Sequence, residues 1–113
     1  MQSAPRDERL PRTACDLDLL LFFVRHPHSL LTSQELVALV GYDVAAVADS
    51  VERLLAAGVL TRSRNTTHAG SLYALEASTL HAGPWFALVQ EAETREGRLR
   101  VIRALKANQA MEP

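Results

Sequence analysis

The chain has 113 residues and a formal net charge of −1, with 48% hydrophobic and 22% charged residues. This length and composition fit one globular domain with one modest core, and the near-neutral charge lacks the basic balance typical of nucleic-acid binders. The single cysteine, Cys15, excludes an internal disulfide, and no apolar run approaches the roughly 20 residues of a membrane span, so we expect a cytoplasmic protein without a membrane partner.

Residues 1–13 predict a flexible tail, because two prolines and a dense mixture of Arg, Asp and Glu leave little to bury. Arg6, Arg9 and Arg12 have the composition of a basic arm that contacts phosphates. Acidic residues between them dilute this charge, which favours a solvated tail. The segment has no apolar core of a signal peptide, so no export signal is expected.

The segment from Asp16 to Arg25 predicts a helix that is apolar nearly all round, with an acidic start, a basic end and Pro27 as its stop. Such a helix must be covered on more than one side. We assign one side to the domain core: Leu17, Leu20, Leu21 and Val24. The other side needs a second cover and comprises Leu19, Phe22 and Phe23. The C-terminal helix or another copy of the chain can supply that cover.

Two histidines separated by one residue, His26 and His28, raise the question of a metal site. Zinc needs three or four ligands, whereas the single thiol and the two other histidines lie in other segments. The pattern favours a polar loop that leads into a short strand at residues 29–31. We therefore predict no bound metal and no other cofactor.

Two short helices joined by a tight turn are predicted for residues 32–60. Thr32 and Glu35 have the spacing of a capping box at the start of the first helix, and Gly41 supplies a left-handed stop. Asp43 suits the cap position of the second helix. The apolar residues of that helix recur at helical spacing and face the core: Val47, Val51, Leu54 and Leu55.

The run Leu54-Leu55-Ala56-Ala57-Gly58-Val59-Leu60, preceded by a capped helix, a glycine turn and a second helix, resembles the winged helix-turn-helix domains of bacterial transcriptional regulators. The resemblance covers roughly residues 15–76. It implies a mainly α (α+β) fold ordered α-β-α-α-β-β-α, with a two-stranded wing and a DNA-binding, homodimeric regulator. We divide the chain into a tail (1–13), a winged helix-turn-helix domain (14–80) and a C-terminal helix (81–113).

In that family the second helix of the pair enters the DNA major groove. Its outward positions in this chain are Ala45, Ala46, Asp49, Ser50, Glu52 and Arg53. The first half of the helix has none of the Arg, Lys, Asn or Gln side chains that make strong base contacts. Residues 32–60 carry one cation and four anions, 1 minus 4 or −3, which repels phosphates. These features support an alternative, a winged-helix module that docks on protein through its acidic helix.

The wing has a composition that suits DNA better. Arg62 and Arg64 alternate along one strand, so their side chains point to the same face. The polar tip that follows contains Thr66, Thr67 and His68. In the family such a wing contacts the DNA backbone or the minor groove. The predicted DNA-binding set joins these five residues to five of the helix: Ala45, Ala46, Asp49, Ser50 and Arg53. An exposed hairpin with two solubilising arginines is an equally simple interpretation.

The residues from Pro84 to Asn108 predict one long helix, which Gly97 weakens and bends or splits. Its apolar residues fall at alternating three- and four-residue steps, like a coiled-coil seam: Trp85, Leu88, Ala92, Leu99 and Ile102. A helix packed on its own domain is one interpretation. The surplus of apolar surface favours a dimer helix instead. The predicted dimer interface joins this seam to Leu19, Phe22 and Phe23.

The sequence contains no recognisable catalytic motif, whether nucleophile elbow, phosphate loop, metalloprotease helix or paired carboxylates at a known spacing. The aromatic share of 5% also disfavours a stacking surface for RNA or single strands. We therefore expect a homodimer that is not an enzyme. Its predicted partner is double-stranded DNA, and the alternative is a protein partner.

Overall fold

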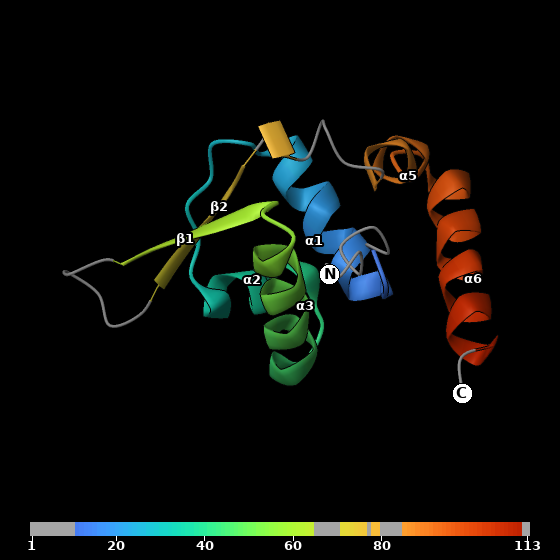
Figure 1. Cartoon of the computed structure of the whole chain (residues 1–113), viewed down its shortest axis with the longest axis horizontal. Coiled ribbons are helices and arrows are strands. Elements are labelled where there is room, and N and C mark those ends of the chain that lie inside the picture. The colour runs from blue at the N-terminus through green and yellow to red at the C-terminus, as the bar shows by residue number, and fades with distance from the viewer. Residues whose placement is uncertain (1–10, 65–70, 77, 80–84, 112–113) are drawn as a thin grey trace, which may run out of the picture.

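The computed structural model describes residues 11–64, 71–76, 78–79 and 85–111, and for Arg64, Trp85 and residues 108–111 it describes the backbone alone. Its helices and strands are α1 (Ala14–Arg25), α2 (Ser33–Val40), α3 (Val44–Ala56), β1 (Leu60–Arg64), β2 (Ser71–Leu75), α5 (Trp85–Glu91) and α6 (Arg95–Met111) (Figure 1). The expectation of a mainly helical, α+β protein with a two-stranded antiparallel sheet is confirmed.

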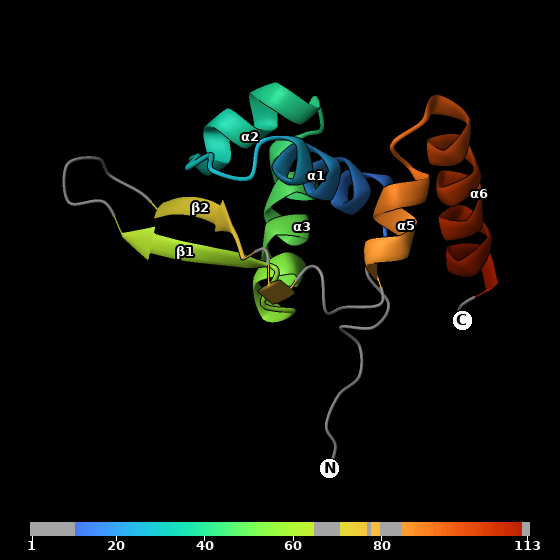
Figure 2. The ribbon, with the colours of Figure 1, turned by 90° about the horizontal axis from the view of Figure 1, so that it is seen from above.

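Helix α1 lies at the centre of the molecule and contacts α2, α3, α5 and β2. The hairpin of β1 and β2 projects from one side, and α6 forms the opposite edge behind α5 (Figures 1 and 2). Thr13 caps α1, because its Oγ1 accepts a hydrogen bond from the Asp16 amide at 3.0 Å. This cap starts the helix at Ala14, two residues before the predicted start.

The second cover that the apolar helix α1 requires comes from the same chain. Leu19 and Phe23 are fully buried, and α5 packs against this helix. Ala92, after the end of α5, is also buried. These three residues were predicted to form a dimer interface, and that prediction is wrong, because a buried side chain is not exposed to a second copy. Phe22 is partly buried and packs against the core.

Both caps predicted for the helix pair are confirmed. Thr32 and Glu35 form a capping box, with the Glu35 amide donating to Thr32 Oγ1 at 3.2 Å and the Thr32 amide donating to Glu35 Oε1 at 2.9 Å. Gly41 ends α2 with φ of 80°. Asp43 caps α3 by accepting a hydrogen bond from the Ala46 amide at 2.7 Å. These local contacts set where α2 starts and ends and where α3 starts.

The sheet pairs β1 and β2 in antiparallel register, with Leu60 opposite Leu75 and Arg62 opposite Tyr73. Tyr73 also exchanges two backbone hydrogen bonds with Leu31, at 3.1 and 2.8 Å, on the other side of β2. The strand predicted at residues 29–31 is therefore reduced to a single bridge. This bridge ties the loop after α1 to the middle of β2.

The C-terminal segment forms two helices, and the break between α5 and α6 lies before Gly97, the residue at which the sequence predicted a bend or a split. Thr94 restarts the helix, its Oγ1 accepting a hydrogen bond from the Gly97 amide at 3.0 Å. Gly97 does not make the break, but it lets the first turn of α6 approach the end of α5. A Cβ atom at this position would lie 1.8 Å from the carbonyl oxygen of Glu91. The two helices therefore need a residue without a side chain here.

The apolar seam predicted for the C-terminal region differs from the one in the structure. The side chains that are buried are Val89, Ala92, Val101 and Leu105. Leu99 instead keeps 45% of its surface exposed, because α6 turns another face toward α5. Leu88 and Ile102 are half-buried against the core. Trp85 opens α5, and its side chain lies outside the described part of the structure.

Candidate interaction surface

The arginine of α3 is held by a buried carboxylate of α1. Asp16 has no exposed surface, and Arg53 donates to it through Nε at 3.0 Å and through Nη2 at 3.0 Å. The Arg12 amide donates to the same carboxylate at 2.9 Å. Hydrogen bonding to Asp16 raises the pKa of the Arg53 guanidinium. This bidentate geometry is the strong form of a charge-assisted hydrogen bond.

Two of the residues predicted to contact DNA, Ser50 and Arg53, instead make contacts within the chain. Ser50 is buried and lies 3.3 Å from Arg53 Nη2, so it cannot reach a base edge. Arg53 retains 28% exposure of its side chain, but its charge is engaged by Asp16. The prediction for Ser50 is wrong, because its side chain is buried, and Arg53 faces the carboxylate of α1 with only part of its side chain exposed.

The remaining outward positions of α3 form an apolar and acidic surface. Ala45 and Asp49 are exposed, as predicted, and Ala46 is half-buried. Glu52 is also exposed, and Val44 at the first helical position keeps 70% of its surface in contact with solvent. This face presents carboxylates and methyl groups but no unpaired cation among the described residues.

On the wing, Arg62 is paired with α3. Its Nη2 lies 2.9 Å from Glu52 Oε2, and its guanidinium carbon lies 5.7 Å from the centre of the Tyr73 ring. The pair is exposed, so its energetic value is small, but the positive charge has a carboxylate beside it. Arg64 is described by its backbone alone, and Thr66, Thr67 and His68 lie outside the described residues.

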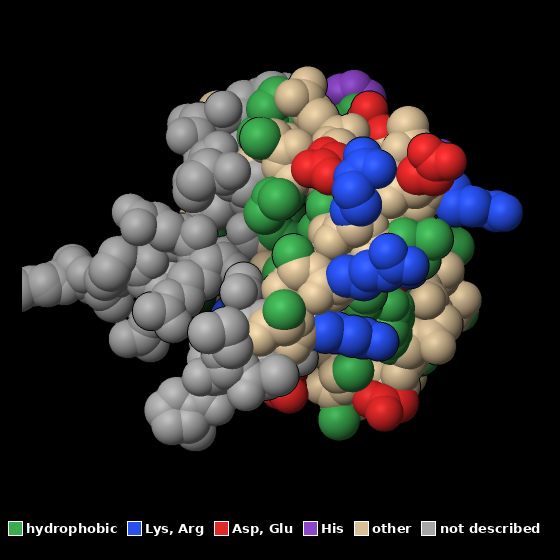
Figure 3. All heavy atoms as spheres, turned by 90° about the vertical axis from the view of Figure 1, so that its right-hand side faces the viewer, with side chains coloured by type: hydrophobic (Ala, Val, Ile, Leu, Met, Phe, Trp, Pro, Cys, Tyr) green, Lys and Arg blue, Asp and Glu red, His purple; other side chains and the backbone are tan. Residues whose placement is uncertain are grey.

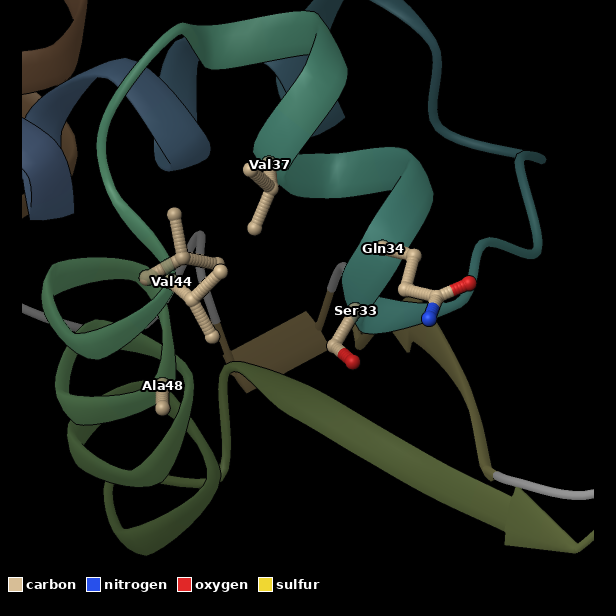
Figure 4. A pocket seen from close by; sticks show the side chains of 6 residues that line it. Ser33, Gln34, Val37, Val44 and Ala48 are labelled. Atoms are coloured by element: carbon tan, nitrogen blue, oxygen red, sulfur yellow. The ribbon is translucent and has the colours of Figure 1, made fainter.

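A groove of about 290 Å³ separates α2 from α3. It is lined by Ser33, Gln34, Val37, Val44, Val47 and Ala48. Figure 4 shows Val37 and Val44 facing each other across the opening, with Ala48 one turn further along α3. One residue in the sequence indicated this groove, but the prediction did not use it. Val44 is apolar, yet it lies outside the core face of its helix. Such a groove suits an apolar side chain of a partner.

A second carboxylate of α1, Asp18, joins three elements. Arg98 of α6 donates to it through Nε and Nη2, both at 2.8 Å, and the Tyr42 hydroxyl donates to Oδ2 at 2.7 Å. Tyr42 lies in the turn between α2 and α3, next to the cap that starts α3. Asp18 therefore links α6 to the turn that positions the groove. Sequence reasoning missed this contact, because Asp18 and Arg98 are far apart in the chain.

The Tyr42 hydroxyl gives this contact a measurable pH dependence. Burial, together with the hydrogen bond to Asp18, raises the pKa of Tyr42 from 10.0 to about 12. The folded state thus holds this proton more tightly than the unfolded state does. We expect the stability from Tyr42 to be complete below pH 10 and to be lost as the pH rises toward about 12.

Urea unfolding across this pH range checks the Tyr42 prediction. Tyr42→Phe should remove the Tyr42 part of the alkaline loss, and Asp18→Asn should move the absorbance midpoint of the phenol down toward its ordinary value. An identical pH dependence in wild type and Tyr42→Phe would contradict it.

In the described part of the chain, no three potential metal ligands gather in one place. Within the same residues, no helix combines the length and apolar character needed to cross a membrane. Comparisons with protein-family models, with curated proteins and with solved structures found no match to this chain. The surface is therefore interpreted from its own residues.

Proposed function

We propose that this chain is a winged helix-turn-helix module of the bacterial regulator type that binds a protein through the groove between α2 and α3. The order of a capped helix, a glycine turn, a second capped helix and a two-stranded hairpin supports this fold. The bridge between Leu31 and Tyr73 adds the edge of a third strand, at the place where the family has one. The single free, buried cysteine suits a cytoplasmic setting.

The observation that carries the proposal is the pairing of both arginines near α3. Arg53 is bound by Asp16 and Arg62 by Glu52, whereas Asp43 and Asp49 form no ion pair with a described residue. The phosphates of DNA are repelled by such a surface. An apolar groove on a helix pair with a net negative charge instead favours a basic segment with a protruding apolar side chain.

A displayed library of random peptides, selected on the full chain, tests this function. We expect the selected peptides to be rich in Arg or Lys and Leu, and to bind wild type but not Ala48→Arg, which fills and charges the groove. Ala87→Arg adds the same side chain at an exposed position of α5 and should leave binding unchanged. Peptides that bind both variants equally, or the absence of any enriched peptide, would refute the docking function.

A homodimeric, DNA-binding regulator is the second candidate, and the exposed Arg62 on the wing is the observation that favours it. Fluorescence anisotropy with a mixed-sequence duplex at two salt concentrations distinguishes the two. If DNA is the partner, Glu52→Gln should strengthen binding by releasing Arg62. Arg62→Ala should weaken binding to all sequences and flatten the salt slope by about one unit. Absence of binding at low salt by both wild type and Glu52→Gln would exclude this candidate.

A further inference from the structure

Helix α6 has a charge opposite to that of the rest of the chain. It carries five cations and one anion, a net charge of 5 minus 1, or +4. Because the whole chain has a net charge of −1, the remaining residues sum to −1 minus 4, or −5. Figure 3 shows Lys and Arg side chains gathered down the middle of the face that contains α6, with acidic side chains above and below them.

Three of these cations are exposed and form no ion pair with another described residue: Arg95, Arg103 and Lys106. The other two are engaged, Arg98 by Asp18 and Arg100 by Glu91. Steps of four, four and three residues place Arg95, Leu99, Arg103 and Lys106 in one row along the helix. Leu99, 45% exposed, lies in the middle of this row. We call these four residues the basic row.

We propose that the basic row of α6 docks into the groove between α2 and α3 of a second copy of this chain. The inference rests on the proposed docking function and names its occupant. Leu99 supplies the apolar side chain that the groove between Val37, Val44 and Ala48 suits. The cations on either side of Leu99 are attracted to the net negative charge of the α2–α3 pair, so the two surfaces are complementary in charge and in apolar character.

Two other occupants of the basic row fit less well. Nucleic-acid phosphates would use the cations but not the exposed Leu99 between them. A second α6 would place like charges opposite one another, which opposes the symmetric dimer expected from the sequence. The α2–α3 surface has the negative charge that suits the cations of the basic row, and it has the apolar groove that suits Leu99.

The two surfaces lie in different parts of the molecule. In both ribbon views α1 and α5 lie between α6 and the α2–α3 pair, so a chain does not cover its own groove with its own α6 (Figures 1 and 2). Docking of one copy on the next is therefore heterologous, head to tail. Contacts of this kind produce an open series of oligomers, or a ring where the rotation closes.

Sedimentation velocity of the full chain tests the assembly at low and high salt. We expect wild type to form species larger than a monomer at low salt and to dissociate at high salt, because exposed charges are screened. Arg103→Glu reverses a charge in the basic row, and Ala48→Arg blocks the groove. Each variant alone should be monomeric. Arg25→Glu makes the same charge change on α1 and should assemble like wild type.

An equimolar mixture of the two blocked variants gives the sharpest result. Arg103→Glu keeps an intact groove and Ala48→Arg keeps an intact basic row, so we expect a one-to-one dimer and no larger species. A mixture that stays monomeric would overturn the proposal. So would association that Arg103→Glu abolishes and Ala48→Arg does not, since that result means α6 pairing with α6.

Two further outcomes would also overturn the docking of one copy on another. In both cases the proposed protein-docking function can still be tested separately. A wild type that stays monomeric at low salt rules out self-docking, while library peptides that require an open groove would still support protein docking. Binding of mixed-sequence duplex DNA by a monomer, lost in Arg103→Glu, would make the basic row a nucleic-acid surface instead.

Discussion

Replacing Arg53 with methionine is expected to lower the free energy of unfolding by about 3 kcal/mol. The substitution leaves the fully buried carboxylate of Asp16 without the Arg53 guanidinium, while the Arg12 amide still donates to it. Removing one partner of a buried pair costs about 3–5 kcal/mol, and the 28% exposure of Arg53 places this case at the lower end. Urea unfolding at neutral pH measures the loss.

Two control variants distinguish the free-energy cost of a buried, unpaired charge from the cost of losing the arginine side chain. The double variant Asp16→Leu/Arg53→Met removes both charges and should recover most of the lost stability, as apolar replacements of buried pairs do. Arg62→Met breaks an exposed pair with Glu52 and should cost less than about 1 kcal/mol. Equal losses for Arg53→Met and Arg62→Met would show that Asp16 is not buried against α3.

Gly97→Leu is expected to detach α6 from the rest of the protein. A Cβ at this position would already lie 1.8 Å from the Glu91 carbonyl oxygen, a backbone atom that cannot rotate away. The cost is limited by undocking, which exposes Val101 and Leu105 at roughly 2 kcal/mol each, so we expect a loss of about 4 kcal/mol. Leucine forms helices better than glycine by less than about 1 kcal/mol, so the clash dominates.

Hydrogen exchange shows where the Gly97→Leu effect falls. Amides of α6 should lose protection, while those of α1 and α3 keep theirs, because α6 packs mainly on α5 whereas α1 and α3 pack on each other and on α2. Ala104→Leu adds a similar side chain on the exposed face of the same helix and should leave both protection and stability unchanged. Unaltered protection of α6 in Gly97→Leu would contradict the close approach of α5 and α6.

The parts of the fold that the sequence predicted are those encoded within a few residues. The capping box of Thr32, the left-handed stop at Gly41 and the cap at Asp43 each depend on neighbours three or four positions away. The split of the C-terminal helix was expected at Gly97 and lies instead just before Arg95, although the cap at Thr94 is equally local. The continuous apolar pattern suggested one helix, and the steric requirement at Gly97 comes from the carbonyl group of another helix.

The candidate surface was predictable in charge but not in detail. Counting Asp43, Asp49 and Glu52 already indicated an acidic helix, and that feature remains. The loss of Arg53 from this surface depends on Asp16, which lies 37 positions earlier, and no local pattern encodes such a pair. The groove depends on the angle between α2 and α3, and the burial of Leu19 and Phe23 depends on where α5 packs.

The electrostatic character of the α3 surface is set from inside α1. Asp16 touches no solvent, yet it determines whether the guanidinium of Arg53 is held inward or is available at the surface. A lineage that replaced this one carboxylate with a neutral residue would gain a cation on its exposed helix without any change in the exposed sequence. A mutational scan that selects for a changed binding partner would therefore detect substitutions at position 16, although no partner can contact that buried residue.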